Sequence, residues 1–494
     1  MSLGSPLDAE TLPAHFARRV ARHRELPAPV ELPSSGATPT WGDVARRARV
    51  LALGLCDIGV GPGVEVVVAP GGAAERIAAE QAVLAAGAAL LVGPPTPERS
   101  VAGGRPDAPF VLGWAGTAGA PVSGAAGGPA GVPAEEGARC LDAADLAVEG
   151  ARCLDAADLA VEGARCLDAA RLAVEGAAID DRHPDRFEQH VAGLDPASPA
   201  LVACGHRFTH REAVWALRSL ERWLDPELAA EAASEPIGAG ATAGRGGAPV
   251  PTARPPVLVA ADPADATANL VTTWWSLAAG APVVVLPGAD DPRAGEPGAD
   301  GPRAGDPGAD GRFAGALRML RPVVVVLDAS HLGTIAAALH SDRRLARSAA
   351  GRRFLATGRA LAAGDPVSPL RRSLQARRDG RRGRALRAGL GLDRATAVVA
   401  LGAPPEAVRR ELLALGVPLR IAWSPPGVLG PATVTSGAEP PGSRGRPAPG
   451  RTVRVETGGR IVVEGAGVAG GRVDAGARGT LDDRGRLHLR PGRR

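Results

Sequence analysis

The stretch VEVVVAPGGAAERIAAEQAVLAAGAALLV, residues 64–92, indicates the fold class. Its two ends, 64–70 and 88–92, are short apolar runs typical of buried strands, and residues 73–86 between them have the pattern of a helix. A strand, a helix and a second strand in this order form a βαβ unit with parallel strands. The sequence therefore predicts an α/β fold, with a parallel sheet covered by helices.

The same order of elements recurs later in the chain. Residues 396–423 again predict a strand, a helix and a strand, and the apolar runs 281–287 and 321–328 are also strand-like. The pattern then changes, because residues 452–465 and 479–490 each predict a β-hairpin, the first with a Gly-Gly turn. A large α/β body thus leads into a smaller β-rich region.

Residues 40–58 predict an amphipathic helix. Thr40 and Asp43 form a candidate capping box at its start, and Gly59 is a candidate stop. Four apolar residues recur at helical spacing and should face the core: Val44, Ala48, Leu51 and Leu55.

Two internal repeats interrupt the α/β pattern. GARCLDAADLAVE occurs at 137–149 and 150–162, with a near copy at 163–175, and a Gly/Pro-rich unit recurs within 288–315. Short identical copies are poorly suited to three different packing environments, so both repeats are expected to be solvent-exposed insertions. A spacing of 13 residues does not place Cys140, Cys153 and Cys166 on one helix face, so no metal site is expected there.

These patterns predict two regions. Residues 1–422 form an α/β body with insertions at 102–175, 233–255 and 288–315, and residues 423–494 form a β-rich subdomain.

The basic residues are unusual in kind. The chain has no Lys and no Tyr, so all 57 basic residues are Arg, and a mechanism that needs a lysine amine within this chain is excluded. The net charge of +4 is small, and we expect no nucleic-acid partner. The Arg-rich stretch 370–387 is compatible with a phosphate or anionic membrane contact, and equally with a solvated helix or loop.

Cysteine usage and hydropathy favour a cytoplasmic protein. The five cysteines include no CxxC pair, which suits a reducing compartment. The longest apolar run, residues 82–92, is too short to span a bilayer, and the N-terminus lacks the apolar segment of a signal peptide.

Several stretches together resemble the adenylate-forming (AMP-binding) enzymes, in particular the long-chain acyl-CoA synthetases. They include SLAAGAPVVVLPG (276–288), VVALGAPPEAVRRELLALGVPLRIAW (398–423) and GSRGRPAPGRTVRVETGGRIVVEGAGV (442–468), and they occur in the family's order along nearly the whole chain. The resemblance implies a large domain of two helix-flanked sheets with a small β-rich subdomain. It also implies that the chain stops at the hinge before the family's mobile C-terminal domain.

Family members use ATP and Mg²⁺ to convert a carboxylate into an acyl-adenylate, which CoA then attacks. Their phosphate loop reads T-S-G-T-T-G-x-P-K-G, whereas residues 200–214 here read ALVACGHRFTHREAV. Gly205 matches the closing glycine of the loop, and Thr209 begins the Thr-His-Arg that follows it. The loop itself is deleted, and Cys204 stands in its place, either as a catalytic residue or as a structural thiol.

The family's second motif, Tyr-Gly-x-Thr-Glu, corresponds to residues 423–427. Trp423 replaces the aromatic residue that packs on adenine, and it either stacks on a ring or fills the edge of a core. Pro426 replaces the phosphate-binding Thr, and Gly427 replaces the Glu that holds Mg²⁺, so the resemblance implies that these ligands are lost.

A third motif, Thr-Gly-Asp, holds the ribose hydroxyls in the family. Ala477 stands at the position of its Asp, so that carboxylate is also lost. Gly402, Ala403 and Pro404 match the family's Gly-Ala-Pro beside the adenine, although a plain strand-to-helix turn explains them equally well.

The sequence therefore predicts an acyl-CoA synthetase-like protein with impaired or no catalysis, because removing even one charge-stabilising group costs about 10²–10³ in rate. Such a protein would act as a scaffold, as a partner of an intact acyl-CoA synthetase, or as a binder of acyl or nucleotide groups. One alternative is an active ATP-dependent fatty acid–CoA ligase completed by a C-terminal domain in trans, and another is a decaying gene without a role.

Overall fold

The computed structural model divides into two compact units. The first comprises Met1–Glu25, Thr38–Val214 and Gly295–Asp300, and the second comprises Leu26–Ala37, Trp215–Ala294 and Gly301–Arg494. The structure describes residues 10–31, 38–69, 72–92, 110–113, 165–232, 256–262, 265–286, 307–340, 349–363, 365–368, 383–436 and 439–490.

The first unit is built on a six-stranded sheet in the order β5-β4-β2-β3-β6-β7. All neighbouring strands are parallel except β6 and β7, which are antiparallel. The strands are β2 (Glu65–Val68), β3 (Ala89–Val92), β4 (Phe110–Gly113), β5 (Arg165–Asp168), β6 (Pro199–Ala203) and β7 (His206–Thr209). The predicted βαβ unit at 64–92 is confirmed, because β2 and β3 are parallel neighbours joined by a helix.

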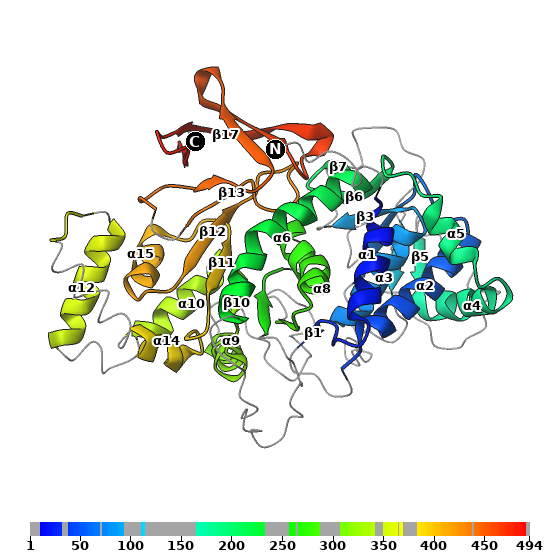
Figure 1. Ribbon diagram of the computed structural model, residues 1–494, viewed down its shortest axis with the longest axis horizontal. Helices are drawn as coiled ribbons and strands as arrows, with labels where there is room; N and C mark the ends of the chain where they lie inside the picture. The colour runs from blue at the N-terminus through cyan, green and yellow to red at the C-terminus, as the bar shows by residue number, and fades with distance from the viewer. Residues whose placement is uncertain are drawn as a thin grey trace, which may run out of the picture. The chain divides into compact units, whose positions relative to one another are not determined.

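The helices of this unit are α1 (Leu12–His23), α2 (Trp41–Asp57), α3 (Ala73–Ala85), α4 (Ala169–Arg182) and α5 (Arg186–Ala192), and α6 (His210–Ala232) begins in it (Figure 1). The predicted start of α2 is confirmed: Thr40 N–H donates to Asp43 Oδ2 at 2.9 Å, and Asp43 N–H donates to Thr40 Oγ1 at 3.2 Å. Gly59 follows the helix at φ +84°, and the four predicted core residues of α2 are all buried.

Helices α2 and α4 approach each other through two glycines. A Cβ on Gly54 would lie 2.3 Å from the carbonyl oxygen of Leu172, and one on Gly176 would lie 1.7 Å from that of Val50. Only glycine allows backbones to come this close.

Part of the predicted insertion 102–175 belongs to the sheet. β4 and β5 lie in it, and α4 begins at residue 169 with the Asp168 side chain accepting from Ala170 N–H at 2.9 Å. The third repeat copy therefore does not form an exposed insertion, because its apolar residues Leu167 and Leu172 are buried. The first two copies, with Cys140 and Cys153, lie outside the described residues, and so does the predicted loop 233–255.

The second unit has an eight-stranded sheet in the order β1-β9-β8-β10-β11-β12-β13-β14. Neighbours from β1 to β12 are parallel, and β13 and β14 join in antiparallel fashion. The strands are β1 (Val30–Glu31), β8 (Val257–Ala260), β9 (Val283–Val285), β10 (Val324–Asp328), β11 (Ala397–Leu401), β12 (Leu419–Trp423), β13 (Thr433–Val434) and β14 (Arg446–Pro447). The second predicted strand–helix–strand unit is confirmed by β11, α15 (Glu406–Ala414) and β12.

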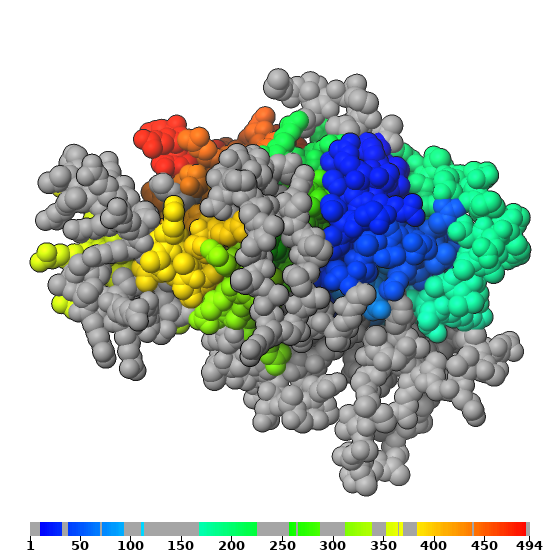
Figure 2. Space-filling view, turned by 60° about the horizontal axis from the view of Figure 1, so that its bottom comes forward, coloured from blue at the N-terminus to red at the C-terminus, as the bar shows by residue number. Residues whose placement is uncertain are grey.

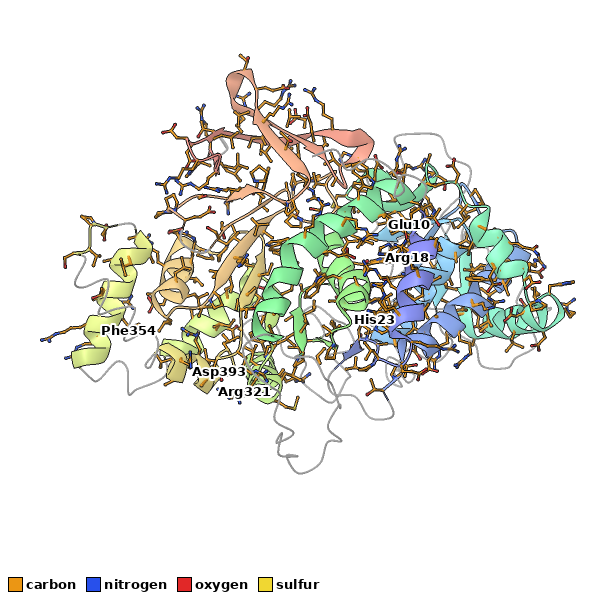
Figure 3. All side chains as sticks on the ribbon, viewed as in Figure 1. Glu10, Arg18, His23, Arg321, Phe354 and Asp393 are labelled. Atoms are coloured by element: carbon orange, nitrogen blue, oxygen red, sulfur yellow. The ribbon has the colours of Figure 1, made fainter. Side chains whose placement is uncertain are left out.

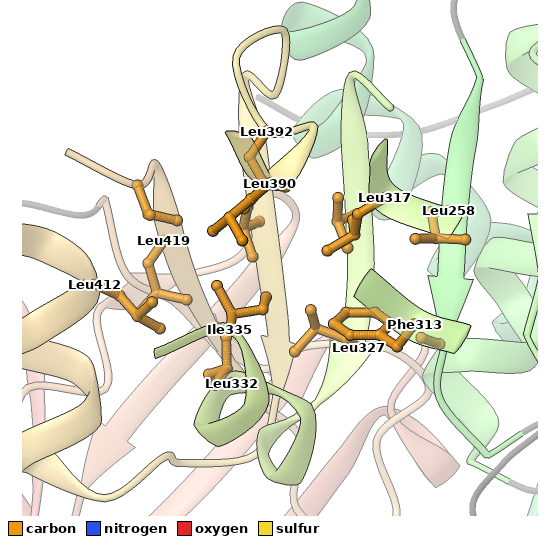
Figure 4. Packing of buried hydrophobic residues seen from close by; sticks show 14 of the residues in the cluster. Leu258, Phe313, Leu317, Leu327, Leu332, Ile335, Leu390, Leu392, Leu412 and Leu419 are labelled. Atoms are coloured by element: carbon orange, nitrogen blue, oxygen red, sulfur yellow. The ribbon is translucent and has the colours of Figure 1, made fainter. Parts of the chain in front are cut away.

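The other helices of this unit are α7 (Ala266–Asn269), the π-helix η2 (Leu270–Trp275), α8 (Ser276–Ala279), α9 (Pro307–Leu320), α10 (Ala329–His340), α12 (Ala349–Ala363) and α14 (Arg384–Leu390). Leucines from strands and helices form its main core, with Phe313 of α9 beside Leu327 of β10 (Figure 4). The predicted insertion 288–315 therefore ends earlier than expected, because α9 begins at residue 307 and buries Phe313. Near this core, Arg321 pairs with Asp393 through Nε at 3.1 Å (Figure 3).

A four-stranded antiparallel sheet completes the second unit. It consists of β15 (Arg451–Val455), β16 (Arg460–Gly465), β17 (Arg472–Leu481) and β18 (Leu487–Leu489), in that order. Both predicted hairpins are confirmed, with Gly458 and Gly459 at φ +80° and +81° in the first turn. Within the described ranges, no helix combines the length and apolar character that crossing a membrane would require.

Candidate functional site

The position matched to the phosphate loop is a tight turn in the first unit. β6 ends at Ala203 and β7 begins at His206, and these two residues are paired across the hairpin. Cys204 and Gly205 alone connect the strands, with φ +46° and +89°, the pattern of a type I′ turn. The Cys204 side chain is exposed, so it is not the buried structural thiol that the sequence allowed.

Thr209 has a structural role at the start of α6. Its backbone N–H and its hydroxyl donate to Glu212 Oε2 at 2.8 and 3.1 Å, and Glu212 N–H donates to Thr209 Oγ1 at 3.2 Å. This reciprocal arrangement is a capping box, which satisfies backbone donors that the helix leaves free.

His210, the next residue, is completely buried. Its Nδ1 accepts from Leu12 N–H at 3.3 Å, and burial lowers the pKa of its ring to about 4, so the ring is neutral at pH 7. Since Nδ1 is the acceptor, the proton lies on Nε2, which has no hydrogen-bond partner within the described part of the chain.

In the second unit, the carboxyl edge of the parallel strands carries most of the remaining candidates. The order of strands along the chain reverses between β8 and β10, and such a switch point is where ligands bind in open α/β sheets. Asp262 follows β8, and its N–H donates to Oδ2 of Asp328, the last residue of β10, at 3.2 Å. Burial, with the neighbouring carboxylates of Asp265 and Asp262 adding to it, raises the pKa of Asp328.

Asp265 caps the short helix α7. Its Oδ1 accepts from the N–H groups of Thr267 and Ala268 at 2.7 and 2.9 Å, and burial raises the pKa of its carboxyl group. Sequence reasoning missed these aspartates, although two of them closely follow apolar strands, which is the position expected of residues at a carboxyl edge. Among the described residues, no group of three or more His, Cys, Asp or Glu side chains has a geometry that could hold a metal ion.

Two predicted positions meet at this edge. Gly402 follows β11 at φ +88°, and its N–H donates to Ala422 O at 3.2 Å, next to Trp423 at the end of β12. Ala403 is exposed and Pro404 is buried, and α15 begins two residues later. Gly402, Ala403 and Pro404 thus form a strand-to-helix turn that lies beside Trp423.

Trp423 is half-buried and packs on the small core of the antiparallel sheet, which includes Val428 and Val468. After it, Ser424 Oγ lies 3.3 Å from Thr267 Oγ1 of α7. Pro426 is exposed, and Gly427 is buried with φ +80°. Ala477 of β17 is partly buried against the same small core as Trp423.

The segment after Gly427 is held by a buried arginine. Arg451 Nε donates to Ala466 O at 2.7 Å, and its two terminal nitrogens donate to the carbonyl oxygens of Pro431 and Leu429. Complete burial lowers the pKa of Arg451 to about 9, so the side chain stays charged at pH 7. All its bonds are to backbone carbonyls, which makes it a clamp for this segment.

These residues do not fit ATP with Mg²⁺ as the family holds them. A two-residue turn offers no row of backbone N–H groups for phosphates, and neither Gly427 nor Ala477 carries a carboxylate.

Comparison with known proteins identifies the fold. No family model matches the chain, and no curated protein matches it in sequence. Solved structures match along almost its whole length. Unliganded o-succinylbenzoate coenzyme A synthetase (MenE) from Bacillus subtilis is 12% identical with a TM-score of 0.56, covering 97% of this chain and 79% of that one.

Two further structures give the same result. The N-terminal domain of FACL13 from Mycobacterium tuberculosis is 13% identical with a TM-score of 0.54, covering 98% of this chain and 100% of that one. VinN in complex with L-aspartate is 13% identical with a TM-score of 0.57, covering 98% of this chain and 99% of VinN. At such low identity the similarity establishes the fold alone. The chain has the fold of the adenylate-forming enzymes, with two helix-flanked sheets and a small antiparallel sheet.

Proposed function

We propose that this chain keeps the adenylate-forming fold without the ATP-dependent chemistry, and that it acts as a scaffold, as a partner of an active synthetase, or as a binder of acyl or nucleotide groups. The two-residue turn Cys204-Gly205 carries the proposal. Strand pairing continues up to both ends of this turn, so the backbone between β6 and β7 is used for the hairpin.

The size of the expected defect follows from the groups that adenylation requires. Each charge-stabilising donor lost from a reaction centre typically costs about 10²–10³ in rate. The phosphate loop and two carboxylates are replaced here, and the chain has no lysine. Losses of groups that act together are not additive, yet with the loop, both carboxylates and the lysine all absent we expect adenylation to be close to background.

The backbone at Gly427 opposes a simple return of the metal-binding carboxylate. Its φ of +80° is a conformation that disfavours side chains other than glycine, and its carbonyl accepts from Ala469 N–H at 3.0 Å. A Gly427→Glu variant would therefore be strained, so we do not expect this single substitution to restore metal binding.

Pyrophosphate exchange tests the proposal. The purified chain is incubated with ATP, Mg²⁺ and carboxylic acids from short to long chain length, with Bacillus subtilis o-succinylbenzoate coenzyme A synthetase and its own acid as the positive control. We expect no exchange above the no-enzyme rate at any chain length. Exchange above that rate, and its loss in Trp423→Ala, would show that the chain adenylates after all.

The alternative of an active ligase completed in trans is tested with the same ATP, Mg²⁺ and carboxylic acids in a second assay. The isolated C-terminal domain of an acyl-CoA synthetase is added, and thioester formation from CoA is followed. We expect no product, because an added domain does not supply the phosphate loop. Product that depends on both chains would favour the alternative.

A further inference from the structure

The first unit contains a groove between α1 and α2, to which α3 and α5 also contribute. Its volume is about 340 Å³, and Figure 2 shows α1 in dark blue beside α2 on one face of this unit. Such a volume is at the lower end of the range for small-molecule sites. We propose that this groove binds a small amphipathic molecule with a neutral carboxamide-type head group, a function separate from the adenylation question.

The central observation is the side chain of Gln81 on α3, which lines the groove. It is 2% exposed, and neither Oε1 nor Nε2 has a hydrogen-bond partner among the residues that the structure describes. Buried amides are normally bonded, because leaving the polar atoms unsatisfied costs free energy. In the same helix, the side chains of Arg76 and Glu80 are also buried, but they bond to each other, with 2.6 Å between Arg76 Nη1 and Glu80 Oε1. Gln81 therefore offers both a donor and an acceptor to a ligand.

The walls of the groove are apolar. Phe16 and Val20 of α1 lie on one side, Ala48 of α2 on another, and Phe187 of α5 closes the lining. A water molecule takes about 30 Å³ of liquid volume, so the groove would hold about ten groups of that size. That is the size of a carboxamide with a chain of about eight carbons.

The charges around the groove favour a neutral ligand. Of the three arginines in its lining, Arg46 pairs with Asp43 at 3.1 Å, and Arg49 pairs with Asp180 at 2.8 Å while its guanidinium lies over the Phe187 ring. Arg24 is exposed, so water and salt screen its charge. Arg18 of α1, which is outside the groove lining, pairs with Glu10 at 2.5 Å (Figure 3).

The kind of head group is inferred from Oε1 and Nε2 of Gln81, which lack hydrogen-bond partners among the described residues. A carboxamide presents a donor and an acceptor in one plane and can bond to both Oε1 and Nε2. A carboxylate only accepts and would also be desolvated as an ion, and an N,N-dialkyl amide only accepts. The amide should therefore bind more tightly than either analogue with the same chain.

Binding to the full chain is measured by chemical-shift titration with octanamide, sodium octanoate and N,N-dimethyloctanamide. For a ligand of ten non-hydrogen atoms we expect a Kd of roughly 0.1–1 mM for octanamide. Sodium octanoate and N,N-dimethyloctanamide cannot donate a hydrogen bond to Gln81 Oε1. They should therefore bind at least about fivefold more weakly than octanamide.

The matched variants are Gln81→Leu and Gln189→Leu, since Gln189 on α5 is exposed and outside the groove lining. Gln81→Leu should weaken octanamide binding about tenfold or more and raise the Tm, because it removes an unsatisfied buried amide. Gln189→Leu should change neither. A further variant, Ala17→Trp, places a large side chain at an exposed position in the groove wall. It should abolish binding while the Tm stays close to that of the wild type. This variant tests the groove if Gln81→Leu does not fold.

Three results would overturn the proposal. They are no titration with octanamide, equal affinity for octanamide and its N,N-dimethyl analogue, and undiminished binding in Gln81→Leu or Ala17→Trp. A lower Tm in Gln81→Leu would also contradict the proposal. It would mean that the Gln81 amide already has hydrogen-bond partners, such as water, in the protein without ligand. None of these measurements involves ATP, so their outcome is independent of the pyrophosphate assay.

Discussion

Two connections between antiparallel strands, one in each unit, differ in length and in what holds their backbone. Between β6 and β7 the connection consists of Cys204 and Gly205 alone, and the pairing of the two strands satisfies the backbone around it. Between β12 and β13 the connection, residues 424–432, has nine residues and is fixed by Arg451. The first connection is held by strand pairing, whereas the second is held by a buried side chain.

A connection can therefore be fixed either by its own strand ladder or by a side chain from another strand. Where two strands pair directly with each other, a two-residue turn is enough to connect them, because the ladder satisfies the backbone up to both ends of the turn. Where a longer segment joins two neighbouring strands, its backbone needs donors from elsewhere, and Arg451 supplies them to the carbonyl groups of Leu429 and Pro431.

The largest expected effect is that of Arg451→Met, which tests whether the longer connection is held by this side chain. It removes donors from the carbonyl groups of Leu429, Pro431 and Ala466, and unsatisfied buried carbonyls cost about 1–3 kcal/mol each, partly offset by removal of a buried charge. We expect the free energy of unfolding, measured with urea, to fall by about 3–5 kcal/mol. Arg454→Met, on the same strand but exposed, should change it by under about 0.5 kcal/mol. Equal effects of the two substitutions would show that Arg451 does not fix the segment after Gly427.

The next test concerns His210, the residue that follows β7 at the start of α6. Its pKa of about 4 in the folded chain is below the ordinary 6.5, so below pH 6.5 the unfolded chain binds a proton that the folded chain does not. The contribution of His210 to the free energy of unfolding should therefore be present above pH 6.5 and be lost as the pH falls toward 4, by up to about 3 kcal/mol.

His210→Asn keeps an acceptor for Leu12 N–H and does not titrate, so its stability should decline less than that of the wild type over this pH range. His183→Asn, at an exposed histidine, should follow the wild-type curve. If the His210→Asn curve runs parallel to that of the wild type, the buried ring does not carry the pH dependence.

A smaller effect is expected at Gly205. Its φ of +89° suits glycine, and an alanine there should lower the free energy of unfolding by about 1–2 kcal/mol. Gly315→Ala is the matched control, since Gly315 lies in α9 with open space around it and should gain about 0.5–1 kcal/mol from the substitution. A neutral Gly205→Ala would mean that the turn relaxes into another conformation.

The smallest expected effect is a gain in stability at Cys204. Cys204→Asn creates Asn-Gly, the pair preferred in type I′ turns, and should raise the free energy of unfolding by about 0.5 kcal/mol. Cys204→Val at the same position should lower it by about 1 kcal/mol, because a branched side chain disfavours positive φ. The reverse order of the two variants in thermal melts would contradict the turn assignment.

Much of the fold was predictable because its signals are local. The capping box at Thr40, the helical spacing along α2 and the Gly-Gly turn of the first hairpin each depend on a few neighbouring residues. The strands β4 and β5 escaped prediction because they lie among repeats and Gly/Pro-rich sequence, without the adjoining strand–helix–strand pattern that marks β2 and β3.

The candidate site was less predictable, since its geometry depends on contacts between distant segments. The short stretch around Cys204 can be read from the sequence, but the hydrogen bond between Asp262 and Asp328 depends on sheet order, which no local pattern encodes. Gln81 gave no signal in the sequence, because its burial without a hydrogen-bond partner among the described residues is a property of the packed helices.

The close approach of α2 and α4 has a consequence for how the gene can vary. Gly176, whose missing side chain lets α4 lie against Val50, immediately follows the last of the three 13-residue copies, and the last copy alone supplies β5 and the start of α4. Selection should therefore act on that copy and on Gly176. An insertion or deletion inside this copy would move Gly176 away from Val50, so functional forms of the gene should keep the length of the last copy unchanged.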